Sequence, residues 1–208
     1  MTDQWDRKQH WENIYSSKAE QEVSWFQEVP EISLELIRQT GIAPSAPIID
    51  IGGGESRLAL CLQQSGYKNI AVLDIAATAL EKAKKRMGAA ASSVEWICAD
   101  VTTFNPGHQY DLWHDRAAFH FLTEEDERQR YITTATAAIR AGGFLILGAF
   151  SDKGPLKCSG IEVKRYAAED LNRLWEKDFE PVSHIYTDHK TPFDTLQHFT
   201  FCVFKRKA

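Results

Sequence analysis

The sequence has few cysteines and no excess of basic residues, and each shortage excludes a class of protein. The four cysteines, Cys61, Cys98, Cys158 and Cys202, are far apart and form neither a C-x-x-C pair nor a Cys/His cluster at zinc spacing. We therefore expect free, buried thiols in a reducing compartment and no metal site. The net charge of -5 lacks the basic footprint that nucleic acid usually requires, so nucleic acid is not an expected partner.

Long apolar runs are also missing. Residues 1–17 are crowded with charged and amide side chains instead of the apolar stretch of a secretory signal. The longest apolar stretches, such as Gly143–Phe150, have the length of a strand and fall well short of a membrane span. These absences predict a cytoplasmic protein with no membrane partner. The hydrophobic fraction of 43% and the charged fraction of 25% are ordinary for folded chains.

From Pro47 onward, apolar strands alternate with amphipathic helices, which is typical of parallel α/β layers. The expected strands are Ile48–Ile51, Asn69–Asp74, Val94–Cys98, Tyr110–His114, Gly143–Phe150, Val182–Tyr186 and His198–Phe204. The last two have no helix between them long enough for a parallel crossover, so they should form a hairpin. We predict an α/β fold in a single domain, residues 1–208: a three-layer α/β/α sandwich with a mostly parallel seven-stranded sheet and a C-terminal antiparallel hairpin.

The expected helices divide the domain into three parts. Residues 1–46 should form a helical lid, residues 47–150 a cofactor-binding core, and residues 151–208 a substrate-side helix with the terminal hairpin. The expected helices are Trp5–Tyr15, Pro30–Gln39, Ser56–Gln64, Ala77–Met87, Ala167–Lys177 and one that begins at a capping box of Thr123 with Asp126 and ends at Gly142-Gly143.

The strongest motif is Asp50-Ile51-Gly52-Gly53-Gly54-Glu55-Ser56, where a buried strand gives way to a helix. Consecutive glycines remove every Cβ from a turn and permit positive φ, so a ligand can approach the backbone, although a tight turn alone would use them too. A dinucleotide fingerprint needs a glycine at position 57, where Arg57 stands. A P-loop needs a lysine that is absent between Gly52 and Leu62.

Acidic residues stand at or near the ends of the first three strands. Asp50 suits a cofactor that carries positive charge, such as S-adenosylmethionine with its sulfonium and amino group. Asp74 is placed to take both ribose hydroxyls, and Asp100 to accept from an adenine amino group. The expected cofactor-binding set is Asp50, Gly52, Gly53, Gly54, Ser56, Arg57, Asp74, Ile75, Asp100, Val101 and Trp25.

Together these segments resemble the class I, Rossmann-like, seven-stranded S-adenosylmethionine-dependent methyltransferase family. The resemblance covers roughly residues 47–150 and is carried by Asp50–Gly54, Val72–Asp74, Ala99–Val101 and Ala141–Leu145. It implies S-adenosyl-L-methionine as methyl donor and S-adenosyl-L-homocysteine as product.

A finer resemblance is to the subgroup that contains lysine methyltransferases of elongation factor and citrate synthase. Gly54–Leu58 is similar to its Gly-x-Ser-x-Leu segment, but Arg116-Ala117 replaces the Lys-Gly of its Asp-Lys-Gly segment. Many bacterial small-molecule methyltransferases look similar too. We predict a small-molecule acceptor, with a protein lysine as the alternative and a non-catalytic binding module as the alternative from another class. The target atom and the oligomeric state are not indicated.

Candidate catalytic residues follow the fourth strand, beside the expected cofactor crevice. His114, Asp115 and His120 are the predicted set, because a histidine and a carboxylate can accept a proton from the acceptor. The alternative pairs Asp115 with Arg116 and packs His120 against neighbouring phenylalanines.

Two further residues are interpreted as ligand contacts. Trp25, beside Phe26, lies between two helical stretches and suits a lid contact with a sulfonium cation. Arg57 stands at the positive end of its helix, where a cation needs an anionic partner. The methionine carboxylate of the cofactor is one candidate, and Glu55 is the other.

Overall fold

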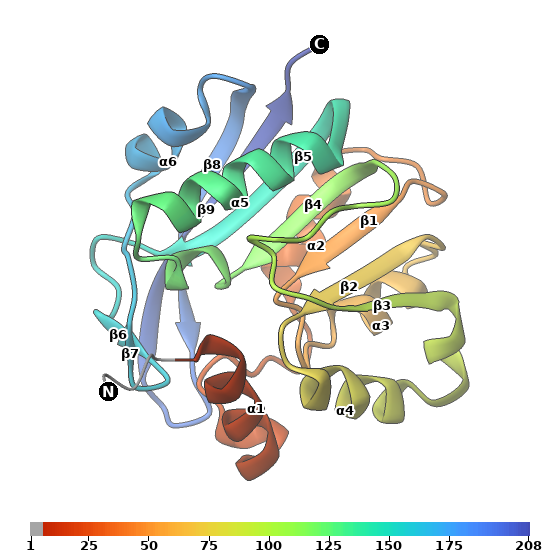
Figure 1. Cartoon of the computed structure of the whole chain (residues 1–208), viewed down its shortest axis with the longest axis vertical. Helices are drawn as coiled ribbons and strands as arrows, with labels where there is room; N and C mark the ends of the chain where they lie inside the picture. Colours follow the sequence, from red (N-terminus) through yellow and green to blue (C-terminus); the bar gives the residue numbers. More distant parts are fainter. Residues whose placement is uncertain (1–5) are drawn as a thin grey trace.

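The seven-stranded sheet has the order β3-β2-β1-β4-β5-β9-β8 (Figure 1). This computed structural model describes residues 6–208, so Trp5, the expected start of the first helix, lies outside the described residues. The strands are β1 Ile48–Ile51, β2 Ile70–Asp74, β3 Val94–Cys98, β4 Tyr110–Arg116, β5 Ile139–Phe150, β8 Phe179–Lys190 and β9 Leu196–Arg206. The first five are parallel and β9 runs antiparallel to both β5 and β8. The predicted fold class is confirmed.

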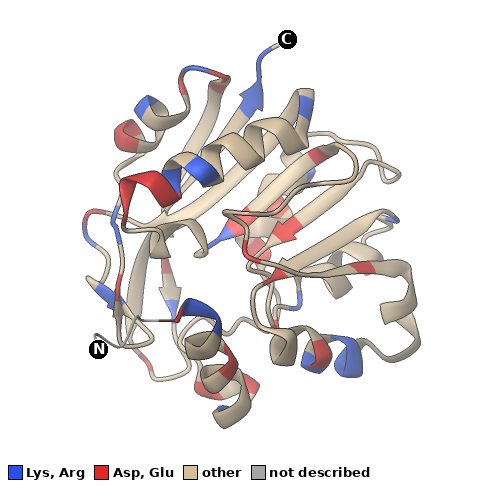
Figure 2. Ribbon diagram, in the orientation of Figure 1, with Lys and Arg blue, Asp and Glu red and all other residues tan. Residues whose placement is uncertain are grey.

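Helices cover both faces of the sheet, as the alternating pattern predicts. They are α1 Arg7–Ser17, α2 Glu31–Gln39, α3 Leu58–Gln64, α4 Ala77–Met87, α5 Glu125–Ala138 and α6 Ala168–Trp175, with short 3-10 turns η1 Glu20–Glu22, η2 Gly88–Ser93 and η3 Phe119–Phe121. One hydrophobic cluster packs α5 and α6 on the sheet, and another packs α2, α3 and α4 on its opposite face. The acidic first turn of α5 stands out in Figure 2 and complements the positive end of that helix.

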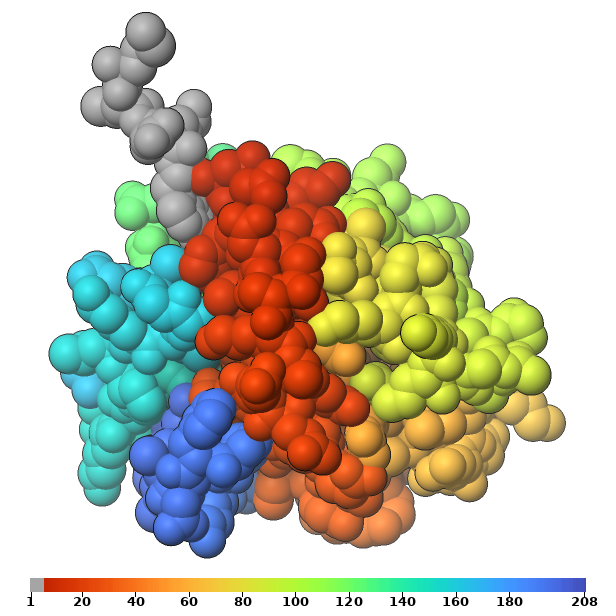
Figure 3. Space-filling view, turned by 90° about the horizontal axis from the view of Figure 1, so that it is seen from below, coloured from red at the N-terminus to blue at the C-terminus, as the bar shows by residue number. Residues whose placement is uncertain are grey.

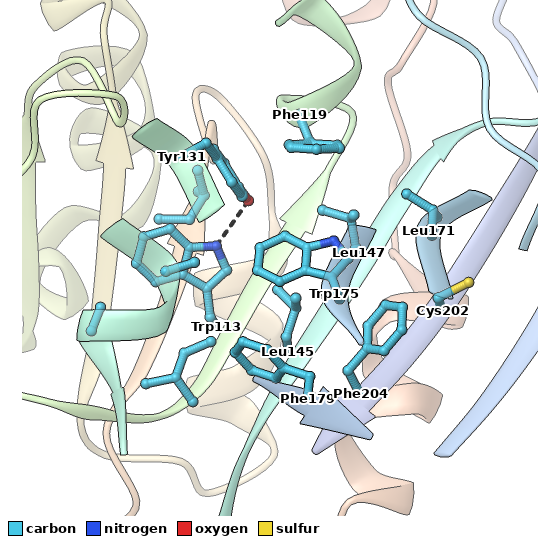
Figure 4. Close-up of a cluster of buried hydrophobic side chains, with 14 of the residues drawn as sticks. Trp113, Phe119, Tyr131, Leu145, Leu147, Leu171, Trp175, Phe179, Cys202 and Phe204 are labelled. Atoms are coloured by element: carbon cyan, nitrogen blue, oxygen red, sulfur yellow. Dashed lines mark hydrogen bonds between the residues drawn. The ribbon is translucent and has the colours of Figure 1, made fainter. Parts of the chain in front are cut away.

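The core under α5 and α6 holds β4 in place. Trp113 of β4 is fully buried, and its indole Nε1 donates to the Tyr131 hydroxyl at 2.9 Å (Figure 4). Trp175 packs edge to face against Tyr131 and Phe179. Buried aromatic side chains of this size contribute much of the packing energy of a core. They fix the strand whose carboxyl end carries the candidate catalytic residues.

Two sequence expectations about α5 are wrong. The helix begins at Glu125 with Glu124 as its N-cap and no side-chain capping bond, so the capping box of Thr123 with Asp126 is absent. It ends at Ala138, before Gly142, because the chain already pairs with β4 from Ile139 onward. Gly142 has a φ of +75° where the register of that pairing shifts, so the glycine serves an irregular strand instead of a helix end.

The C-terminal third contains a feature that the sequence analysis missed. Lys157–Cys158 (β6) and Ile161–Glu162 (β7) form a small separate sheet around a tight turn. All four cysteines are free, but only Cys158 and Cys202 are buried, and Cys98 is exposed, which corrects the expectation of buried thiols.

Within residues 6–208, no helix is long and apolar enough to cross a membrane, and no cluster of three metal-ligating side chains occurs. The cytoplasmic location and the single-domain division stay predictions.

Candidate active site

A cavity runs across the carboxyl ends of the strands in the order in which the strands lie in the sheet. It measures about 830 Å³ with its open mouth included. Asp100 near the end of β3 and Asp74 of β2 line one end, Gly52 after β1 lines the middle, and Arg116 of β4 with Phe150 of β5 continue toward β9. The opposite end of the cavity is closed by aromatic side chains and by Gln197.

The glycine turn approaches its neighbours closely. A Cβ on Gly53 would come within 2.7 Å of Asp50 Oδ2 and of a Val72 methyl, so no other residue fits there without movement. Gly52 has a φ of +60°, and a Cβ at that position would meet Ala118 at 2.6 Å. Glycine is therefore required at these two positions by neighbouring side chains, and at Gly52 by the backbone conformation as well.

Asp74 is almost completely buried, and its Oδ1 accepts from the Ala76 amide at 2.8 Å. Burial raises the pKa of Asp74 to about 7, although the backbone amides of Ala76 and Gly54 oppose the shift. Asp100 lies at the same end of the cavity. Its Oδ1 accepts from the amide and the hydroxyl of Thr102, at 2.8 and 2.7 Å. Ile75 and Val101, which follow these two acids, also line the cavity.

The N-terminal segment roofs the cavity. Figure 3 shows this segment lying across the molecule between α4 and the C-terminal third of the chain. Trp11, Tyr15 and Trp25 of this segment line the cavity, and Tyr15 is buried beside Asp74 and Gly54. Glu12 of α1 binds this segment to α4, because its carboxylate accepts hydrogen bonds from the first two backbone amides of α4 at 2.7 and 3.2 Å.

His114 lies below the glycine turn, in a buried chain of three polar side chains. Its Nδ1 is 2.7 Å from Asp50 Oδ1, and its Nε2 is 2.9 Å from Ser33 Oγ on α2. All three side chains are nearly inaccessible to solvent. They line a hollow of about 340 Å³ that adjoins Gly53 and Ser56, and His114 does not line the large cavity.

The other two predicted catalytic residues also lie outside the lining of the cavity. Asp115 is fully buried and accepts from the amides of Ala118 and Phe119 and from the Tyr131 hydroxyl, so it closes the turn after β4. The imidazole Nδ1 of His120 accepts from the Phe150 amide, and burial lowers the pKa of His120 to about 3. None of the three predicted catalytic residues, His114, Asp115 and His120, lines the large cavity, and their catalytic role stays a prediction.

The arginines near the glycine turn are mostly held by carboxylates. Glu20 and Glu28 bind the guanidinium of Arg57, whereas Glu55, one of its two candidate partners, lies beside Lys82 and Arg86. Binding of the cofactor carboxylate by Arg57 stays a prediction. Arg57 also stacks over the Phe26 ring at 5.5 Å.

Arg116, which was considered as a partner for Asp115 and as a departure from the Asp-Lys-Gly segment, lines the cavity.

Several lining residues could not be predicted from the sequence, because they come from segments far apart in the chain. These residues are Arg7, Phe150, Gln197 and Phe199, and Ser33 was missed beneath the glycine turn. Ser33 sits inside an ordinary helix, so no local pattern marks it. The position of Arg116 at the end of β4 was the one available signal.

The comparisons with known proteins agree with this architecture. The family model described as a methyltransferase domain matches residues 48–143. A malonyl-[acyl-carrier protein] O-methyltransferase from Anoxybacillus flavithermus is 30% identical over 113 residues, which cover 54% of this chain and 42% of that protein. An eEF1A lysine and N-terminal methyltransferase homolog from Drosophila melanogaster is 21% identical over 141 residues, which cover 64% of this chain and 21% of that protein. The chain thus spans less than half the length of these curated relatives.

Solved structures show the same fold over nearly the whole chain. A SAM-dependent methyltransferase from Anabaena variabilis superposes with a TM-score of 0.78 at 19% identity, covering 98% of this chain and 96% of that one. The N-methyltransferase NodS from Bradyrhizobium japonicum, in complex with S-adenosyl-L-homocysteine, gives a TM-score of 0.71 at 15% identity, covering 98% of this chain and 100% of that one. Residues 48–143 therefore match a methyltransferase domain, and the chain shares the fold of a SAM-dependent methyltransferase of known structure.

Proposed function

We propose that this protein transfers the methyl group of S-adenosyl-L-methionine to a small-molecule acceptor. The observation that carries the proposal is the order of side chains along the cavity: carboxylates at the β2 and β3 end, the glycine turn in the middle, and aromatic side chains toward β5 and β9. This order suits a polar adenosine at one end and an acceptor with an apolar body at the other.

The cofactor is assigned to the end that Asp74 and Asp100 line. Asp74 is proposed to accept from the ribose hydroxyls and Asp100 from the adenine amino group, and Gly52 lines the cavity next to them. When bound, S-adenosylmethionine would supply a methyl group attached to its sulfonium. A lone pair of the acceptor would bond to the methyl carbon while the electrons of the carbon–sulfur bond stay with sulfur.

The protein's own contribution is alignment and exclusion of water. Trp11, Tyr15 and Trp25 cover the cavity, and Glu12 fastens this cover to α4. Alignment alone accounts for much of the rate of an in-line displacement at an activated carbon. We assign no proton transfer to Asp115 or His120, because both are held by backbone amides away from the cavity.

The roof also favours a small acceptor over a protein lysine. A folded protein would have to reach the cavity past α1 and the segment that follows it, which lie across this face (Figure 3). The Anoxybacillus protein is named for a malonyl group carried on acyl-carrier protein, and the Drosophila protein for lysine and N-terminal methylation. For this chain we propose the small-molecule acceptor.

The test combines purified protein with isotopically methyl-labelled S-adenosylmethionine and a cell extract separated into metabolites and proteins. Mass spectrometry should find the label in a metabolite. Asp74→Asn should lose most of this label, whereas Asp126→Asn on the exposed surface of α5 serves as a matched carboxylate control and should keep it.

Two results would contradict the proposal. Label confined to protein lysines would support the lysine alternative. Label in neither fraction, with S-adenosylhomocysteine still bound by the protein, would support the non-catalytic binding module.

A further inference from the structure

Arg116 differs from the other arginines around the cavity. Arg7 lies against Glu127 at 2.5 Å, Arg57 against Glu20 at 2.8 Å, and Arg86 against Glu20 at 3.1 Å. Among residues 6–208, no carboxylate lies within 4.0 Å of the Arg116 guanidinium. Its Nη2 donates instead to the main-chain carbonyl of Trp25 at 3.0 Å.

The position of Arg116 puts its charge where a ligand can reach it. The side chain lines the large cavity and two smaller hollows beside the glycine turn. Burial lowers the pKa of Arg116, but a guanidinium stays protonated inside proteins. A guanidinium has five N–H donors, so donors remain after the bond to Trp25. A cation partly removed from water without an anion is costly, and an anionic ligand would offset that cost.

Arg116 lies between the glycine turn and the acceptor end. Arg116 pairs with Gly148 of β5, and His189 of β8 is close enough to feel its charge. The acids of the other end lie on the far side of β1 from Arg116. Asp74 ends β2 and Asp100 follows β3. Asp50, the acid that acts on Arg116 through space, already accepts from His114. The acceptor end therefore combines one cation with the aromatic rings of Phe121, Phe150 and Phe199 and the amide of Gln197.

We propose that the methyl acceptor is a small carboxylic acid whose carboxylate binds the guanidinium of Arg116, with its apolar body against the aromatic rings of the acceptor end. This inference rests on the proposed function and names its substrate class. Arginine matches a carboxylate with two parallel N–H donors, and this geometry fixes orientation as well as adding affinity. An acceptor held in this way presents one end to the cofactor, as an in-line displacement requires.

The competing source of a carboxylate is the methionine part of the cofactor, and titration with S-adenosylhomocysteine separates the two. Arg116→Gln removes the positive charge and the pair of parallel N–H donors, but it keeps a side-chain N–H donor for the Trp25 carbonyl. Its affinity for S-adenosylhomocysteine should stay within about threefold of the wild-type value. A loss of tenfold or more, with unchanged thermal unfolding, would assign Arg116 to the cofactor and overturn the inference. Wild-type protein that fails to bind S-adenosylhomocysteine would instead defeat the proposed function.

The acceptor is tested with labelled S-adenosylmethionine and a metabolite extract split by anion exchange into retained and unretained fractions. Label should enter a compound of the retained fraction, and treating that fraction with diazomethane, which esterifies carboxylic acids, should abolish labelling. With the labelled fraction, Arg116→Gln should raise the apparent KM at least tenfold, Arg116→Lys less, and Arg130→Gln on the exposed surface of α5 not at all. Label in the unretained fraction, or an unchanged KM in Arg116→Gln, would overturn the inference.

Discussion

The imidazole Nδ1 of His114 lies 2.7 Å from Asp50 Oδ1, and both side chains are almost fully buried. This bond links the end of β4 to the acid that precedes the glycine turn. Ser33 of α2 extends this series of hydrogen bonds, so three separate elements meet beneath the glycine turn. A buried carboxylate depends strongly on its hydrogen-bond partners.

The first prediction concerns this buried chain. His114→Ala should lower the free energy of unfolding by about 2–4 kcal/mol, because Asp50 is left without its partner and a void remains. Ser33→Ala should cost only about 1 kcal/mol, since it removes one hydrogen bond and leaves the Asp50–His114 bond in place. Urea unfolding followed by circular dichroism measures both. Equal and small losses in the two variants would mean that the chain contributes little to stability.

The second prediction concerns Asp115, which the sequence analysis selected as a catalytic residue. Asp115→Asn should lower the free energy of unfolding by about 1–3 kcal/mol, because an amide cannot accept from Ala118, Phe119 and Tyr131 together. The affinity for S-adenosylhomocysteine should change less than threefold in the folded variant. A variant of full stability that binds this ligand normally but transfers no methyl group would restore the catalytic interpretation.

Most of the fold could be predicted from the sequence because strand and helix periods are local. Ile48–Ile51 is found with the expected bounds, since a short apolar run between Pro47 and the glycines leaves little freedom. The cavity likewise follows from a general rule, because parallel strands end at one edge and place Asp74 and Asp100 together. Gly142 was misread because a positive φ suits both a helix end and an irregular strand.

The remaining site residues depend on how the N-terminal segment packs, which no local pattern records. Arg57 was expected to need an anion, and it has two, but Glu20 and Glu28 stand 37 and 29 residues earlier in the chain. The same packing places Tyr15 over Gly54 and Ser33 against His114. Interactions between distant segments therefore decide which polar side chains face the cavity and which are already paired.

The third prediction concerns the roof. A Cβ on Gly54 would collide with the Tyr15 hydroxyl and lie 3.1 Å from Asp74 Oδ2, in a residue whose φ is +49°. Gly54→Ala should therefore displace α1, which limited proteolysis would detect as faster cleavage of the N-terminal segment. Tyr15→Phe in the same chain should restore part of the protection, because it removes the atom in the collision. Unchanged cleavage in Gly54→Ala would show that the roof does not depend on this contact.

The fourth prediction concerns Asp74 and pH. In the unliganded protein the pKa of Asp74 is raised to about 7 by burial, so the carboxyl is protonated below pH 7. Because the folded pKa lies above the unfolded value, the folded state keeps a proton that the unfolded state releases, and the stability contributed by this group falls as pH rises from about 4 to 7.

Ligand binding should show the opposite slope, because two ribose hydroxyls donate best to the ionised form of Asp74. The ionised fraction rises from roughly one tenth at pH 6 to nine tenths at pH 8, so the affinity for S-adenosylhomocysteine should rise about ninefold over this range. Isothermal titration at both pH values measures it. Asp74→Ala should bind roughly thirty to a thousand times more weakly, from a loss of about 2–4 kcal/mol, and should show no comparable pH slope. Equal affinities at pH 7 in two well-folded proteins would remove Asp74 from the cofactor site, whereas a wild-type slope retained in the variant would assign the titration to another group.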